Sequence, residues 1–312
     1  MPRSIFYELV TNAIKKLPGH LVEDGELLIP CEDTAEESNW PRFGDRASAY
    51  TSNNPIELLQ TGNPQDRTIN YIQDIANYAE NNSSKMFLIM SMNPRRGLPV
   101  AFCHRKNVIV AYGNLAQHER QLNKKTISLP ALPMTLLNEN PLQARERKVL
   151  ISFQGAASHN CRKKLFELNN DDDIIIRNPN SSSYSGKIDI LSGIEDISYS
   201  RLLDDSVFGI VARGDANFSY RLLETMSKGA IPIIISDGWI LPFDNTIDWD
   251  SCSLRFSQDS INEIPSIVEK IDARHLFDLQ VNVISYYRTF FRDIDSIVKT
   301  MLKEAFEIIK YI

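Results

Sequence analysis

The most constraining feature of this 312-residue sequence is a strand–loop–helix–strand unit in its second half. The unit consists of an apolar run at Val207–Ala212, a polar loop at Arg213–Asn217, a helix-period segment at Phe218–Lys228 and a second apolar run at Ile231–Ile235. Two strands joined by a helix of this length pair in parallel through a right-handed crossover. Short apolar runs also alternate with helix-period segments elsewhere in the chain. The sequence therefore predicts an α/β fold with doubly wound parallel sheets.

The same patterns place the other elements. Apolar runs predict strands at Leu27–Pro30, Met86–Met92, Asn107–Ala111, Thr126–Leu129, Lys148–Phe153 and Asp173–Arg177. Helical spacing of apolar residues predicts helices at Ser4–Leu17, Thr68–Glu80 and Glu195–Asp205, and three helical segments after Asp259. The polar, proline-interrupted stretch from Cys31 to Pro64 predicts long loops. Prolines cluster again between Pro130 and Arg147, so we expect a first domain of residues 1–140 and a second of residues 141–312.

Charge and cysteine content exclude several classes of protein. The formal net charge of −6 argues against a nucleic-acid partner, because neutralising phosphates requires a surplus of Lys and Arg. The four cysteines lie far apart, which predicts neither a zinc site nor a disulfide framework. The N-terminal residues mix charged and apolar side chains, unlike a signal peptide, and no segment reads as a transmembrane helix. We therefore expect a cytoplasmic chain, unless it is a fragment that lacks an N-terminal anchor.

The loop Arg213–Asn217 occupies the place where parallel sheets bind ligands, because it follows a strand and leads into a helix. Gly214 allows the backbone to approach a ligand closely, and Asn217 is expected to cap the helix. Free N–H groups at the helix start, around Ser219, attract an anion. Arg213 adds a positive charge suited to bidentate phosphate contacts. We expect a diphosphate-binding site at this loop.

Charged side chains share one face of the helix that follows. Arg221 and Glu224 are separated by three positions, which places them side by side. Because a carboxylate accepts hydrogen bonds from sugar hydroxyls, we expect Glu224 to bind a nucleotide ribose and Arg221 to bind phosphate. The alternative is an intrahelical surface ion pair. Asp237 ends the next strand on the same edge of the sheet, where it binds sugar hydroxyls or caps a turn.

The run from Phe218 to Ile234 resembles the donor-site signature of GT-B glycosyltransferases, in which a Glu-containing helix ends in Gly and precedes a Pro-led apolar strand. It is more narrowly similar to the exostosin-like glycosyltransferases, whose pattern includes an Arg–Leu pair before that Glu. Further matches follow in the family's order, at Ser236-Asp237, Leu241-Pro242-Phe243 and Asp248-Trp249. Upstream, the strand led by Arg147, the loop at Gly155 and the helix bearing Arg162 also resemble the family.

The resemblance implies a GT-B-like fold in which two Rossmann-like domains face a cleft. The N-terminal domain, expected to be reduced, would hold the acceptor, and the C-terminal domain would hold the nucleotide sugar. The resemblance also implies transfer without a metal, with Arg162, Arg213 and Arg221 taking the charge of the leaving diphosphate beside Gly155. No cofactor is expected besides the nucleotide-sugar substrate. For a fragment that lacks its anchor, the expected location is the Golgi or ER lumen.

Inverting transfer also requires a base that deprotonates the acceptor. Among the acids that follow the strand Leu27–Pro30, Asp33 is the first candidate, and His104, with a pKa expected near neutrality, is the second. The alternatives are a solvated loop acid and a structural histidine. The family strand that leads into a His-Asp pair corresponds here to the strand ending in Met92-Asn93.

These observations together predict a glycosyltransferase that moves a sugar from a nucleotide sugar, expected to be a UDP-sugar, to a glycan or polysaccharide acceptor. Met92-Asn93 motivates an alternative, a non-catalytic carbohydrate-binding or partner subunit that retained the GT-B fold. Another GT-B enzyme, such as a nucleotide-sugar epimerase, is a third interpretation.

Overall fold

The computed structural model describes residues 105–131, 147–179 and 197–310 continuously, and residues 25–29, 48–50, 55–57, 77, 80–81 and 86–91 in shorter pieces. The chain divides into two compact units. Unit 1 contains Pro130–Trp239 and Asp244–Ile297, and unit 2 contains the chain up to Leu129 together with Ile240–Phe243 and the residues after Ile297. The expected domain boundary at residue 140 lies outside the described residues.

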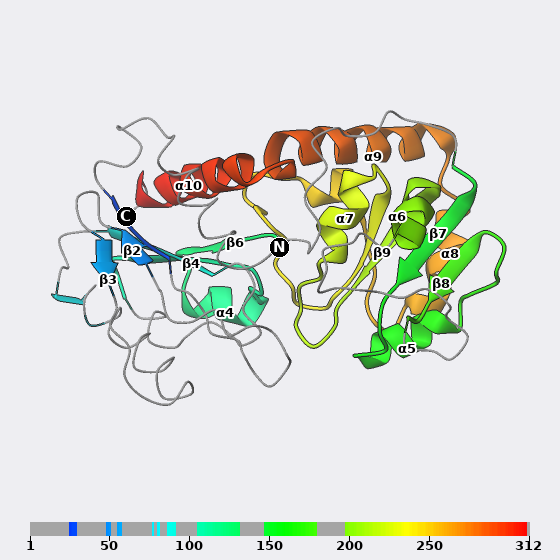
Figure 1. The fold of residues 1–312 in the computed structure, drawn as a ribbon, viewed down its shortest axis with the longest axis horizontal. Helices are drawn as coiled ribbons and strands as arrows, with labels where there is room; N and C mark the ends of the chain where they lie inside the picture. The colour runs from blue at the N-terminus through cyan, green and yellow to red at the C-terminus, as the bar shows by residue number, and fades with distance from the viewer. Residues whose placement is uncertain are drawn as a thin grey trace. The chain divides into compact units, whose positions relative to one another are not determined.

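Unit 1 is built on a five-stranded parallel sheet with the order β11-β10-β9-β7-β8 (Figure 1). Its strands are β7 (Val149–Gln154), β8 (Ile174–Arg177), β9 (Ser206–Ala212), β10 (Ile231–Ile235) and β11 (Leu254–Arg255). All of β10 is buried, as expected for a strand covered on both faces. This sheet confirms the predicted α/β class and four of the predicted strands, and β11 is an additional short strand.

Helices connect and cover these strands. The connecting helices are α5 (Asn160–Phe166), α6 (Ile197–Asp204) and α7 (Arg221–Ser227). The C-terminal part contains a short turn η2 (Trp249–Ser251), a turn η3 (Ile261–Glu263) leading into α8 (Ile264–Val268), then α9 (Ala273–Tyr286), a π-helical turn η4 (Tyr287–Phe291) and α10 (Ile294–Lys310). Figure 1 shows α9 running beside α7. The predicted β9–α7–β10 unit and the C-terminal helical segments are confirmed.

The start of α7 differs from the prediction. The helix begins at Arg221, and the cap is not Asn217, whose carbonyl oxygen instead accepts a hydrogen bond of 2.7 Å from Ser236. Phe218 is buried and its ring packs edge-to-face on Tyr220, with the centroids 5.5 Å apart. The helix therefore starts one turn later than its periodicity indicates, after a buried residue at position 218.

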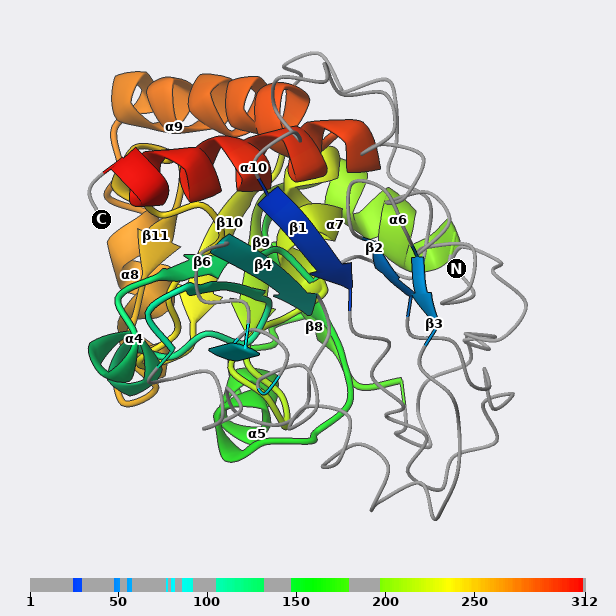
Figure 2. The same ribbon diagram turned by 90° about the vertical axis from the view of Figure 1, so that its left-hand side faces the viewer.

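Unit 2 contains a six-stranded sheet with the order β3-β2-β1-β4-β5-β6. Its strands are β1 (Gly25–Ile29), β2 (Ser48–Tyr50), β3 (Pro55–Glu57), β4 (Met86–Ser91), β5 (Val108–Tyr112) and β6 (Thr126–Ser128), and a helix α4 (Gln117–Leu122) precedes β6. Figure 2 shows β2 and β3 beside β1, to which they add an antiparallel edge. The prediction of loops throughout residues 31–64 is therefore wrong at β2 and β3.

The segment Ile240–Phe243 joins unit 2 through backbone hydrogen bonds. Ile240 N–H donates to the Leu115 carbonyl over 2.9 Å, and Phe243 N–H donates to the Ser128 carbonyl over 2.9 Å. The Ser128 hydroxyl donates in return to the Ile240 carbonyl over 2.6 Å. Among the described residues, no helix is long and apolar enough to cross a membrane.

Candidate functional site

The residues predicted to bind the donor lie at and near the carboxyl edge of the sheet in unit 1. The strand order places β8 on one side of β7, and β9, β10 and β11 on the other. The chain therefore runs from β7 toward one edge of the sheet, to β8, and from β9 toward the other edge, to β10. Open α/β sheets bind ligands at such a switch point. The loops after these two strands are residues 155–158 and 213–217.

Two glycines allow these loops to come close together. A Cβ atom on Gly155 would lie 2.8 Å from the Phe153 ring and 3.3 Å from Nη1 of Arg162. A Cβ atom on Gly214 would lie 3.1 Å from the Ser158 hydroxyl and 3.2 Å from Nη2 of Arg162. Both glycines therefore leave space that the guanidinium of Arg162 requires.

Arg162 ties the two loops to each other. Its Nε donates to the Arg213 carbonyl over 2.8 Å, its Nη2 to the Ala212 carbonyl over 3.0 Å, and its Nη1 to the Ala156 carbonyl over 3.3 Å. Burial and, next, the charge of Arg221 lower the pKa of Arg162. The sequence suggested a phosphate ligand at this position, and the structure adds a role in building both loops around the switch point.

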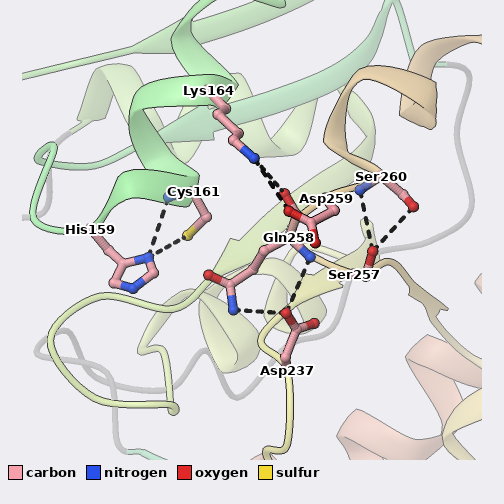
Figure 3. Close-up of polar contacts among 8 residues, drawn as sticks. All are labelled: His159, Cys161, Lys164, Asp237, Ser257, Gln258, Asp259 and Ser260. Atoms are coloured by element: carbon pink, nitrogen blue, oxygen red, sulfur yellow. Dashed lines mark hydrogen bonds and ion pairs between the residues drawn. The ribbon is translucent and has the colours of Figure 1, made fainter.

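His159 caps α5 at the same edge, a role that the sequence analysis missed. Its Nδ1 accepts a hydrogen bond of 3.3 Å from the Cys161 N–H and lies 3.1 Å from the Cys161 thiol (Figure 3). Burial first, and then the charges of Arg213 and Arg162, lower the pKa of His159, while Asp215 acts in the opposite direction. Its position directly before a helix was the signal available in the sequence.

Arg221 and Glu224 form an ion pair on α7. The intrahelical pair of the alternative interpretation is therefore formed, and it is partly buried, with side chains 23% and 17% exposed. The Tyr199 ring, from α6, lies under the Arg221 guanidinium, with 4.3 Å between its Cζ and the ring centroid. Arg221 thus pairs with Glu224, and its charge also lowers the pKa of Arg162.

Ser219 and Arg213 complete the helix end of the site. Ser219 is buried, and its hydroxyl oxygen accepts a hydrogen bond of 3.4 Å from the Arg221 N–H. The backbone N–H of Arg213 donates to the Ile235 carbonyl over 3.0 Å. The Nε of Arg213 is buried and has no hydrogen-bond partner among the described residues. The positive charge expected at Arg213 therefore lies at the edge of the sheet, beside the Arg162 contacts.

Asp237 contacts a segment far along the chain. Its Oδ2 accepts hydrogen bonds from the side-chain Nε2 of Gln258 over 2.9 Å and from the Gln258 N–H over 3.4 Å (Figure 3). Lys164 of α5 lies 3.5 Å from Asp259 and donates to the Gln258 carbonyl over 3.4 Å. Asp237 thus binds the turn after β11 instead of capping its own turn, and sequence reasoning missed Gln258 because no local pattern relates the two residues.

Several sequence candidates lie outside the described residues. They include both proposed bases, Asp33 and His104, and the pair Met92-Asn93. Within the described part of the chain, no group of three or more His, Cys, Asp or Glu side chains is arranged to hold a metal ion.

Comparisons with known proteins add the family. The Exostosin GT47 domain matches residues 87–271, more than half of this chain. Exostosin-1 homolog of Caenorhabditis elegans is 30% identical over 174 residues, which cover 52% of this chain and 46% of that protein. Exostosin-1 of Drosophila melanogaster is 30% identical over 176 residues, which cover 53% of this chain and 23% of that protein. The chain thus matches less than half of the length of either relative.

Among solved structures, Anabaena HepE in complex with UDP is similar with a TM-score of 0.41 and 10% identity, over 78% of this chain and 77% of HepE. The match to the family domain covers the whole of β7, β9, α7 and β10, together with the loops that form the site. The chain therefore belongs to the exostosin GT47 family.

Proposed function

We propose that this chain is a glycosyltransferase that transfers a sugar from a nucleotide sugar, a UDP-sugar, to a glycan or polysaccharide acceptor, with inversion and without a metal. One observation carries the proposal. In a member of the exostosin GT47 family, Arg162 lies against two loop glycines at the switch point of a parallel sheet, beside Arg213, and it feels the charge of Arg221, which pairs with Glu224.

The proposed roles follow from the chemistry of these side chains. Transfer forms a bond between the acceptor oxygen and the anomeric carbon and breaks the bond from that carbon to the diphosphate. Negative charge therefore accumulates on the leaving diphosphate, where the guanidiniums of Arg162, Arg213 and Arg221 stabilise it. The Glu224 carboxylate has acceptor capacity beyond its pair with Arg221, and it accepts hydrogen bonds from the ribose hydroxyls.

The acceptor proton requires a base, and Asp33 and His104 remain the proposed candidates. Single substitutions Asp33→Asn and His104→Gln separate them, because loss of the base lowers kcat and leaves nucleotide binding unchanged.

The test of the function combines binding and turnover. A panel of UDP- and GDP-sugars is screened by thermal shift, since a ligand held only by the native state raises its apparent stability. Nucleotide sugars that bind are then assayed for transfer to glycan acceptors. Arg221→Glu is expected to abolish binding, whereas Arg274→Glu, which makes the same charge change at an exposed position of α9, leaves it intact.

The possible outcomes distinguish the interpretations. Binding with transfer supports the proposal. Binding without transfer to any acceptor favours a non-catalytic subunit. Isomerisation of the nucleotide sugar without an acceptor indicates an epimerase. If Arg221→Glu binds the nucleotide sugar as tightly as the unmodified chain, Arg221 is not part of the nucleotide-binding site.

A further inference from the structure

Tyr199 is a buried aromatic residue directly beneath the predicted phosphate ligand Arg221. It belongs to α6, whereas Arg221 belongs to α7. Its side chain is 5% exposed, and the Arg221 Cζ lies 4.3 Å from its ring centroid. This distance is within the range in which the negative face of an aromatic ring attracts a guanidinium. Neither the motifs of α7 nor its helical spacing point to this residue.

Arg221 is therefore held from two directions. Glu224 binds the guanidinium laterally as an ion pair within α7, and Tyr199 supports it from the neighbouring helix. A free arginine side chain loses considerable rotamer entropy when a ligand immobilises it. A guanidinium that is already immobilised avoids that cost at the moment of binding.

The surroundings of Arg221 explain why such support is needed. Arg162 is close enough that the charge of Arg221 contributes to lowering the Arg162 pKa, after the effect of burial. Two partly buried cations repel each other, and the ion pair with Glu224 and the contact with the aromatic ring compensate part of that repulsion. Arg162 lies against the glycine loops, and an anion bound there would also be attracted by the charge of Arg221.

We propose that Tyr199 is a positioning residue for diphosphate recognition, which holds the Arg221 guanidinium ready for the nucleotide through a cation–π contact. This inference rests on the proposed function. It extends the site to α6, and it makes the affinity for the diphosphate depend on the electron density of one buried ring.

The first test compares Tyr199→Phe with Tyr199→Leu by titration calorimetry with UDP. Tyr199→Phe keeps the ring, so UDP affinity is expected to change by less than about threefold. Tyr199→Leu removes the ring face, and UDP affinity is expected to fall by roughly 5- to 30-fold, the equivalent of a partly desolvated cation–π contact. Thermal unfolding of both variants records any separate loss of stability.

The second test separates the cation–π contact from packing, and it applies even if Tyr199→Leu does not fold. Phenylalanine and its difluoro and trifluoro analogues are incorporated at position 199, because fluorination weakens the negative face of the ring with little change of shape. UDP affinity is expected to fall stepwise along the series. In a double-mutant cycle, Arg221→Met is expected to eliminate the effect of the ring substitutions.

The outcomes keep the inference distinct from the function. If the unmodified chain binds no nucleotide, the proposed function fails and the inference fails with it. If the unmodified chain binds UDP while the fluorinated series shows no trend, the inference alone is overturned and Tyr199 is only a packing residue. Additive effects in the cycle with Arg221→Met overturn it in the same way.

Discussion

At the scale of single residues, Arg162 and Asp237 show how contacts distant in sequence define the site. Arg162 lies on α5 but donates to carbonyls at the end of β9, about 50 positions later, as its contacts with Ala212 and Arg213 show. Asp237 receives two hydrogen bonds from Gln258, 21 positions later. Each side chain is oriented by a partner on another loop, which is how a site on loops acquires defined geometry.

The Asp237–Gln258 contact leads to a prediction about sugar selection. Asp237→Asn and Gln258→Leu are expected to leave UDP affinity unchanged. For the preferred UDP-sugar, kcat/KM is expected to fall by roughly 10- to 150-fold. The reason is that the Asp237 carboxylate, oriented by Gln258, is expected to accept a hydrogen bond from a hydroxyl of the donor sugar, and a hydrogen bond to a charged group contributes about 1.5–3 kcal/mol. Steady-state kinetics with several UDP-sugars measure the change.

The matched control for that prediction is Asp259→Asn, the same chemical change on an exposed side chain two positions after Ser257 in the same turn. Its pair with Lys164 is exposed and contributes little. If Asp259→Asn lowers kcat/KM as much as Asp237→Asn does, the effect belongs to the turn and not to Asp237.

His159 gives a prediction about pH. Its pKa in the folded chain is lowered from 6.5, chiefly by burial and then by Arg213 and Arg162, so the folded state binds a proton less readily than the unfolded state. Its contribution to stability is therefore complete above pH 6.5 and decreases as the pH falls from that value through the folded-state pKa. Urea unfolding measured between about pH 7.5 and pH 5.5 is expected to show this loss.

The reference for the pH prediction is His159→Asn, because asparagine also caps a helix but does not titrate. As the pH falls, the unmodified chain should lose more free energy of unfolding than His159→Asn does. A difference independent of pH would show that His159 does not titrate differently in the two states.

At the scale of elements, the packing of α6 and α7 on β9 depends on Gly209. A Cβ atom at this position would lie 2.6 Å from Cγ2 of Thr225 on α7 and 3.1 Å from Leu203 on α6. Both helices therefore cover the same face of β9, at the contact distance that only glycine permits.

Gly209→Ala is expected to lower the free energy of unfolding by about 1–3 kcal/mol, because the added methyl group overpacks the interface. Adding Thr225→Ala should reduce the destabilisation caused by Gly209→Ala, since it removes both atoms nearest to the new Cβ. Gly238→Ala is the comparison, because Gly238 has a φ of +76° and a Cβ atom there would have no neighbour within 4 Å, so it reports backbone strain alone. The packing explanation would be contradicted if Gly209→Ala and Gly238→Ala lowered the free energy of unfolding equally and Thr225→Ala did not change the effect of Gly209→Ala.

At the scale of the whole molecule, the two edges of the sheet in unit 1 have different roles. The carboxyl edge carries the candidate site. At the amino edge, Arg147 precedes β7 and donates from Nη1 to the carbonyls of Leu203, Asp204 and Ser206 over 3.1, 3.1 and 2.7 Å, and from Nη2 to the Lys228 carbonyl over 2.6 Å. It thereby satisfies carbonyls at the ends of α6 and α7, which helix geometry leaves without a partner in the helix, and the carbonyl of Ser206 at the start of β9.

Arg147→Met is expected to lower the free energy of unfolding by about 2–4 kcal/mol, since it leaves several carbonyls without a charged donor. The free energy of unfolding of Arg147→Lys should lie between those of the unmodified chain and Arg147→Met, because an ammonium group lacks the planar fork of a guanidinium. UDP affinity of the folded protein is expected to stay unchanged, because the residue lies at the opposite edge from the site. Chemical denaturation and calorimetry measure the two properties, and a loss of affinity without a loss of stability would contradict this division.

The sequence by itself determined the elements of unit 1 and the edge at which its site lies. Apolar periodicity predicted β7, β8, β9, β10 and α7, and the loop from Arg213 to Asn217 marked the carboxyl edge. These features depend on the spacing of neighbouring residues, which is visible in one dimension. The exostosin resemblance of the Phe218–Ile234 run, confirmed by the family match, depends on the same contiguous residues.

Only the tertiary structure decided which side chains meet at that edge. The strand order placed the loops after β7 and β9 together around Arg162, brought Tyr199 beneath Arg221, and set Gln258 against Asp237. The structure also places the start of α7 at Arg221, one turn after the position that periodicity indicates. The physical reason is that a strand's neighbours, and the loops that meet at its end, depend on the summed packing of the whole sheet, and no local pattern of residues encodes that order.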